Sequence, residues 1–116
     1  MKKIVLFLTL ICIGTAVSAN SRIEVAQAYC KALSQIAEMA MASRQYDVPA
    51  YETSENILEV LTKAGSTVEI KEVTLSIVEN AYKRPLIEDK ELRKVLIDSF
   101  KDSYFFTCMN AMKDKK

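Results

Sequence analysis

The stretch from Ser21 to Gln45 constrains the fold most, because its apolar residues repeat with the period of a helix. They recur in steps of three and four, which places them along one face. Ser21 followed by Glu24 has the spacing of a capping box, the side-chain pattern that often begins a helix. We therefore predict a first helix over residues 21–45, with a buried face formed by Ile23, Ala26, Cys30, Leu33, Ala37 and Ala40.

The residues before this helix predict export. Lys2 and Lys3 give a positive start, residues 4–13 are continuously apolar, and Val17 to Ala19 supply the small residues that a signal peptidase reads. The apolar run is about half of the roughly 20 residues that a membrane-spanning helix needs, although a retained membrane anchor is the alternative. We predict cleavage after Ala19 and a periplasmic location.

This cleavage would divide the chain into a signal peptide over residues 1–19 and a single domain over residues 20–116. The domain keeps two cysteines, Cys30 and Cys108, which allow only one pairing. An even number of cysteines in an exported protein predicts a disulfide, with two buried free thiols as the alternative. By the chain-entropy argument a bridge over so long a loop stabilises the fold by about 4 to 4.5 kcal/mol.

A second helix is predicted between Pro49 and Gly65. Pro49 disfavours a helical conformation in the residue before it, and Asp47 tolerates the left-handed conformation that often ends a helix. Gly65 stands where glycine usually follows a helix, so we predict that the second helix starts after Pro49 and ends at Ala64. The alternative is a later start, with Thr53 as the cap.

The segment from Ser66 to Arg84 carries signals for both a strand and a helix. Between Ser66 and Leu75 it is rich in valine, isoleucine and threonine, and apolar residues alternate with charged ones, as in a strand. Ser66 and Glu69, however, repeat the capping-box spacing. A lone strand would have no partner, so we predict a third helix that Pro85 ends. The apolar residues that recur at helical spacing in this segment are Ile70, Val73, Ile77 and Ala81.

A fourth helix is predicted from Asp89 to Met112, with Asp89 or Glu88 as its cap. Apolar and aromatic residues descend one face in steps of four, a pattern typical of a core. The four helices together predict an all-α antiparallel bundle, in which the first and last helices are neighbours and the two cysteines join them. The predicted core face of the last helix contains Leu92, Leu96, Phe100, Tyr104 and Cys108, joined by Val95, Ile97 and Phe106.

The composition argues against catalysis. The chain has no histidine, and it lacks a glycine-rich phosphate loop and a cysteine pair at zinc spacing. Its carboxylates are scattered along solvated helix faces, so we predict no catalytic residue, no metal and no cofactor. The formal net charge is +1, and loss of Lys2 and Lys3 gives +1 − 2 = −1. A nearly neutral surface argues against binding to nucleic acid or to a membrane surface.

The end of the first helix and the loop after it form the candidate contact with a partner. Arg44 continues the buried stripe, so its charge needs a partner. It either pairs with Asp47, Asp89 or helix-end carbonyls, or it receives an anionic group from another protein. The loop is apolar and aromatic, as interfaces often are, although it could instead fold back over the end of the bundle. The candidate contacts are Arg44, Gln45, Tyr46, Val48 and Tyr51, with Pro49 and Ala50 between them.

Several short motifs resemble one group of proteins: Cys30, residues 40–45 with the sequence Ala-Met-Ala-Ser-Arg-Gln, Ala81-Tyr82 ahead of Pro85, and then Phe100, Tyr104 and Cys108. The pattern is similar to that of small, mostly uncharacterised, exported helical proteins of Gram-negative bacteria and their phages. Those proteins tend to have glycine where this chain has Asp47. The resemblance implies a periplasmic helical fold and carries no established activity.

These observations lead to three functional hypotheses. The first is a non-enzymatic periplasmic module that binds another envelope protein, as an inhibitor or an immunity protein does. The second is a periplasmic stress chaperone, similar in outline to the small acid-activated chaperones that are also helical and held by one disulfide. The third is an enzyme, which the absence of histidine disfavours.

Overall fold

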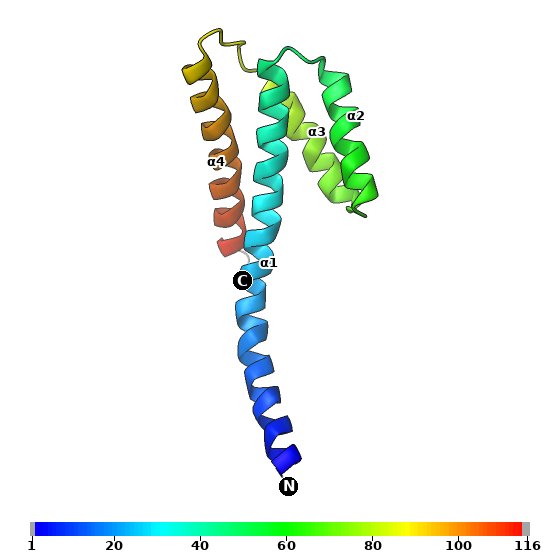
Figure 1. The fold of residues 1–116 in the computed structure, drawn as a ribbon, viewed down its shortest axis with the longest axis vertical. Coiled ribbons are helices and arrows are strands. Elements are labelled where there is room, and N and C mark those ends of the chain that lie inside the picture. Colours follow the sequence, from blue (N-terminus) through cyan, green and yellow to red (C-terminus); the bar gives the residue numbers. More distant parts are fainter. Residues whose placement is uncertain (1, 115–116) are drawn as a thin grey trace.

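The computed structural model describes the backbone of residues 2–114 and the side chains of residues 23–113. Over the described backbone the chain is helical and contains no strand, which confirms the all-α prediction and the helix at residues 68–82. Successive helices run in opposite directions (Figure 1). The helices are α1 (Lys2–Gln45), α2 (Ala50–Lys63), α3 (Val68–Tyr82) and α4 (Lys90–Asp114).

Helix α1 is the central element of the bundle. Figure 1 shows α4 on one side of α1, with α2 and α3 on the other. Within the described residues, α4 packs chiefly on α1 and has few contacts with α2 and α3. The bundle is therefore open on the side between α3 and α4.

The core lies where the other three helices meet the C-terminal half of α1. Alanines at this interface let the neighbouring helices approach closely. Each large apolar side chain buried here contributes about 1.5 to 3 kcal/mol. The buried apolar residues are Leu33, Ile36, Ala37, Ala40 and Met41 of α1, Ile57 of α2, Ile77, Val78 and Ala81 of α3, and Phe100 of α4.

The predicted start of the first helix at Ser21 is wrong. Helix α1 begins at Lys2, so Ser21 lies inside it and does not begin it with a capping box. No proline interrupts residues 2–45, so helical hydrogen bonding can continue through the earlier segment. Ile23, predicted to be buried, is 58% exposed, because it lies beside the last turn of α4 and no further helix covers it. The predicted cleavage after Ala19 falls among residues whose side chains are not described.

Both residues predicted to follow a helix end do so and have a left-handed backbone. Asp47 has φ 60° and Gly65 has φ 75°. At the end of α1 the N–H of Val48 donates to the carbonyl of Ser43 at 2.9 Å, and the N–H of Asp47 donates to the carbonyl of Arg44 at 3.0 Å. This is the Schellman arrangement, which satisfies carbonyls at the helix end and reverses the chain.

The start of α3 differs from the predicted capping box by one residue. Thr67 caps the helix, and its Oγ1 accepts the N–H of Ile70 at 3.3 Å. The prediction failed because Ser66 still belongs to the end of α2: its N–H donates to the carbonyl of Leu61 at 3.0 Å. Thr67 is thus the first residue free to begin α3.

The other two helix starts are as predicted. Helix α2 begins at Ala50 with Pro49 at its N-cap, which confirms the early start. Thr53 therefore lies within the helix and is buried. At the start of α4 the Oδ1 of Asp89 accepts the N–H of Glu91 at 2.8 Å.

The predicted core face of α4 is only partly covered. Phe100 is buried, and Leu96, Ile97, Tyr104 and Cys108 are half-buried. The remaining three residues were predicted to be core and are exposed, because α4 packs chiefly on α1, which covers only part of so wide a face. These residues are Leu92 (58% exposed), Val95 (62%) and Phe106 (62%).

The predicted disulfide is present. Cys30 and Cys108 are bonded, with their Cα atoms 5.4 Å apart, and Cys30 is fully buried. A second link between α1 and α4 is the ion pair of Lys101 and Glu38, whose nitrogen and oxygen are 3.2 Å apart. The disulfide thus joins the first and last helices as the antiparallel arrangement requires.

Candidate functional site at the end of the bundle

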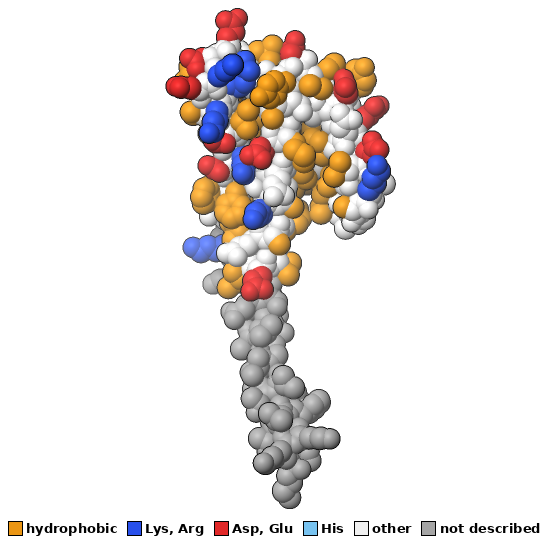
Figure 2. Space-filling model, in the orientation of Figure 1, with side chains coloured by type: hydrophobic (Ala, Val, Ile, Leu, Met, Phe, Trp, Pro, Cys, Tyr) orange, Lys and Arg blue, Asp and Glu red, His pale blue; other side chains and the backbone are white. Residues whose placement is uncertain are grey.

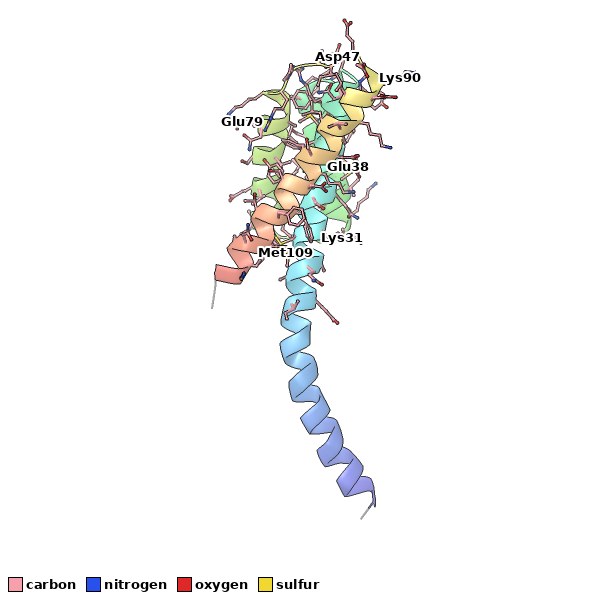
Figure 3. The ribbon with its side chains drawn as sticks, turned by 90° about the vertical axis from the view of Figure 1, so that its left-hand side faces the viewer. Lys31, Glu38, Asp47, Glu79, Lys90 and Met109 are labelled. Carbon is pink, nitrogen blue, oxygen red and sulfur yellow. A yellow bond between two sulfur atoms is a disulfide. The ribbon has the colours of Figure 1, made fainter. Side chains whose placement is uncertain are left out.

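The C-terminal end of α1, the first turn of α2 and the loop from α3 to α4 meet at one end of the bundle (Figure 1). All the residues predicted to contact a partner lie here. In the side view of Figure 3, the labelled Asp47 and Lys90 mark this end, and Met109 marks the other end of α4. The geometry of this site depends on three side chains that hold its loops: Gln45, Arg44 and Tyr82.

Gln45 holds the loop that leads into α4. Its side chain is only 4% exposed, and both ends of its amide are used. Nε2 donates to the carbonyl of Pro85 at 2.9 Å, and Oε1 accepts the N–H of Ile87 at 2.8 Å. Gln45 is therefore engaged within the chain and, unlike its predicted role, is not free to contact a partner.

Arg44 fixes the end of α3. Its Nε donates to the carbonyl of Arg84 at 2.9 Å, and its guanidinium lies 5.5 Å from the centre of the Tyr82 ring. The predicted partner was a carboxylate or a helix-end carbonyl, whereas the carbonyl found belongs to the loop just after α3, which ends at Tyr82. The carboxylates of Asp47 and Asp89 form no ion pair with Arg44 in the described part of the chain, and that of Asp89 caps α4 instead.

Tyr82 connects α3 to the loop after α1. Its hydroxyl donates to the carbonyl of Val48. Because that single proton is used, the hydroxyl of Thr53, 2.8 Å away, must donate to the Tyr82 oxygen. Val48 is half-buried, so the loop folds back onto the bundle at this residue.

Tyr46 and Tyr51 are the predicted contact residues that remain available to a partner. Their side chains are 69% and 71% exposed, so the alternative in which they cover the end of the bundle is wrong for these two residues. Tyr46 is also held in place, because the Arg93 guanidinium lies 5.6 Å from the centre of its ring. Arg93 is itself fixed by donating from Nε to the carbonyl of Ile87 at 3.0 Å.

A basic pocket lies beside Tyr46, with a volume of about 460 Å³. Figure 2 shows Lys and Arg side chains over the start of α4, where three of the lining residues lie. Sequence reasoning missed these cations, although their spacing of three and four residues would have placed them on one helical face. The basic pocket is lined by Tyr46, Lys90, Arg93, Lys94 and Ile97.

A larger groove separates α3 from α4, with a volume of about 620 Å³. It exists because the two helices have few contacts, which the prediction of an antiparallel bundle did not anticipate. Asn80 of α3 bridges it by donating to the hydroxyl of Tyr104 at 2.8 Å. Its lining combines hydroxyls, apolar groups and two cations: Asn80, Lys83, Arg84, Leu96, Ser99, Phe100, Ser103, Tyr104 and Thr107.

The described residues also bear on metal binding and on membrane insertion. Among these residues, no group of three or more His, Cys, Asp or Glu side chains is arranged to hold a metal ion. Over residues 23–113, no helix is long and apolar enough to cross a membrane. No protein-family model, curated protein or solved structure matches the chain, so its resemblance to exported helical proteins stays a prediction.

Proposed function

We propose that this chain is a non-enzymatic protein-binding module of the periplasm, of the inhibitor or immunity kind, whose partner is another envelope protein. The observation that carries the proposal is the exposure of Tyr46 and Tyr51, at 69% and 71%, on an end of the bundle that internal hydrogen bonds hold in place. Tyrosine is enriched at protein interfaces because it offers a large apolar ring together with a polar group.

The way this end of the bundle is held favours binding. A loop that is already ordered loses less conformational freedom when a partner docks, so more of the contact energy appears as affinity. Arg93 restrains the Tyr46 ring, and Tyr82 restrains the backbone at Val48. Both restraints come from helices other than α1, so the contact surface forms only when the bundle is folded.

Export is part of the same proposal. The N-terminal pattern supports cleavage after Ala19, and the Cys30–Cys108 bridge suits an oxidising compartment such as the periplasm. N-terminal sequencing of the chain isolated from a periplasmic fraction should begin at Asn20. Recovery of the chain with Met1 still attached would contradict this part of the proposal.

Capture from an envelope extract tests the binding role. The oxidised chain is compared with Tyr46→Ser/Tyr51→Ser, and with Val60→Ser/Val68→Ser, which removes two apolar groups that are 58% and 66% exposed elsewhere. We expect a partner that the unchanged chain and the control retain and that the tyrosine variant loses. Equal capture by all three chains would refute the role of this end of the bundle.

A stress chaperone is the second candidate, and the exposed Leu92, Val95 and Phe106 of α4 favour it, because a chaperone needs accessible apolar surface. An aggregation assay with an acid-denatured client separates the two functions. Protection that is lost on replacing these three residues with serine, but kept in Tyr46→Ser/Tyr51→Ser, would favour the chaperone. Absence of protection by the unchanged chain would exclude it.

A further inference from the structure

The basic pocket concentrates positive charge in a small space. Lys90, Arg93 and Lys94 line its volume of about 460 Å³, and no carboxylate does. Lys90 and Lys94 are four residues apart on α4, a like-charge spacing that destabilises a helix by a few tenths of a kcal/mol. Helix stability therefore does not explain why these cations share one face.

The charges of this pocket are not neutralised within the bundle. In the described part of the chain none of the three cations forms an ion pair, since the pairs present there are Lys63–Glu59, Lys83–Glu79 and Lys101–Glu38. The neighbouring Asp89 accepts the N–H groups of Glu91 and Leu92 and does not line the pocket. Anionic groups from another molecule can thus approach without displacing an internal partner.

The pocket also has an uncharged wall. The Tyr46 ring forms one part of it and the half-buried Ile97 another. Arg93 is less free than the two lysines, because it donates to the carbonyls of Ile87 and Glu88 and stacks on Tyr46. A ligand that suits this lining carries negative groups for Lys90 and Lys94 and an aliphatic part for Tyr46 and Ile97.

We propose that the basic pocket binds an acidic segment of the partner protein, with Asp or Glu carboxylates on Lys90 and Lys94. This inference rests on the proposed function and adds the charge of the partner. A short protein segment fits better than a nucleic acid or a membrane surface. Among the described residues only three cations line the pocket, and Glu88, Asp89 and Glu91 flank it in sequence, so a few carboxylates can reach the lysines whereas an extended row of phosphates also meets the flanking carboxylates. Binding should weaken as the salt concentration rises, since the lysines are exposed to solvent.

Amide chemical shifts of the oxidised chain, expressed from its full sequence, provide the test. The probe is a short peptide of glutamate and leucine, and the same peptide with glutamine in place of glutamate is the neutral control. We expect the acidic peptide to shift the amides of Tyr46, Lys90, Arg93, Lys94 and Ile97, and the effect to fall several-fold with the neutral peptide or with added salt.

Charge reversal then identifies the residues responsible. Lys90→Glu/Lys94→Glu should abolish the shifts, whereas Lys31→Glu/Lys113→Glu, which changes the net charge equally at exposed positions, should retain them. Shifts that are absent, that spread over all lysines, or that survive Lys90→Glu/Lys94→Glu would overturn the inference. So would a response at these residues to inorganic phosphate or to phosphatidylglycerol vesicles without a response to the acidic peptide.

The capture experiment distinguishes a failure of this inference from a failure of the proposed function. Loss of the envelope partner in both the Lys90→Glu/Lys94→Glu and the Tyr46→Ser/Tyr51→Ser variants would support both. Capture that depends on the tyrosines and not on the lysines would overturn the acidic-segment inference alone. Acidic-peptide binding at the pocket without tyrosine-dependent capture would overturn the proposed function alone.

Discussion

The two ends of α4 are fastened to α1 by different means. Near its C-terminus a single covalent bond, Cys30–Cys108, holds the helix. Near its N-terminus the Gln45 side chain holds the preceding loop through hydrogen bonds to Pro85 and Ile87. Because α4 has few contacts with α2 and α3 in the described residues, it is attached to the bundle by its packing on α1 and, at its two ends, by these two fastenings.

The difference between the two fastenings indicates which end is suited to recognition. A disulfide limits the distance between two points and stabilises the fold largely through the unfolded chain. The Gln45 amide instead requires two backbone groups in fixed directions, so it sets the shape of the loop beside the basic pocket. The hydrogen-bonded end carries the exposed Tyr46 and Tyr51, which is why the proposed binding role belongs to this end and a structural role to the disulfide end.

Removing the disulfide should have the largest effect. We expect Cys30→Ser/Cys108→Ser to lower the free energy of unfolding by about 4 kcal/mol, because the unfolded chain gains the freedom of a long loop. Urea denaturation of the oxidised chain and the variant measures the change. The unchanged chain after reduction should have the same free energy of unfolding as the variant. A loss below about 1 kcal/mol would contradict the importance of the bridge.

Breaking the other fastening should have the next largest effect. Gln45→Ala leaves the Pro85 carbonyl and the Ile87 N–H without their partner, and we expect a loss of about 2 kcal/mol. Gln35→Ala is the matched control, because Gln35 is exposed on the same helix and should change stability by less than about 0.5 kcal/mol. Equal effects of the two substitutions in denaturation would show that Gln45 does not hold the loop.

Tyr82→Phe should weaken the hydrogen-bonded end less. It removes one hydroxyl that bonds Val48 and Thr53 and keeps the ring under Arg44, so we expect a loss of about 1 kcal/mol. Tyr51→Phe, at an exposed tyrosine, should leave the free energy of unfolding nearly unchanged. A loss in the Tyr51 variant as large as that in the Tyr82 variant would argue against this network.

Asp47→Gly should have the smallest effect, and it should stabilise the chain. Asp47 has φ 60°, where glycine avoids the steric penalty of a side chain, so we expect a gain of about 0.5 to 1 kcal/mol. Asp47→Ala, which keeps the penalty, should give no gain. If Asp47→Gly instead lowers stability in thermal or urea unfolding, the Asp47 side chain stabilises the chain by more than its left-handed backbone costs.

Local signals in the sequence were sufficient for much of the fold. Asp47, Pro49 and Gly65 act on their immediate neighbours, so the ends of α1 and α2 could be predicted from them. The disulfide followed from the pairing of two cysteines and the antiparallel topology. The Ser66 cap failed because the N–H of Ser66 bonds to the carbonyl of Leu61 at the end of α2, which leaves Thr67 as the residue that caps α3.

Features that depend on packing between helices could not be predicted. The periodicity of α4 identified an apolar face, but whether Leu92, Val95 and Phe106 are covered depends on how much of that face other helices pack against. Likewise the sequence located the end of α1 as the site and singled out Arg44 and Gln45, yet their partners are backbone groups of a loop about 40 residues away in sequence. Hydrogen bonds to backbone groups leave no pattern in side-chain types.

Amide hydrogen exchange along α4 tests the two-fastening account most directly. Reduction of the disulfide should speed exchange most over residues 104–112, beside Cys108, and leave the Ile87 amide and residues 90–94 comparatively protected. Gln45→Ala in the oxidised chain should do the reverse, with the largest change at Ile87 and the first turns of α4. If both changes speed exchange equally along the whole helix, α4 is not held at its two ends by separate means.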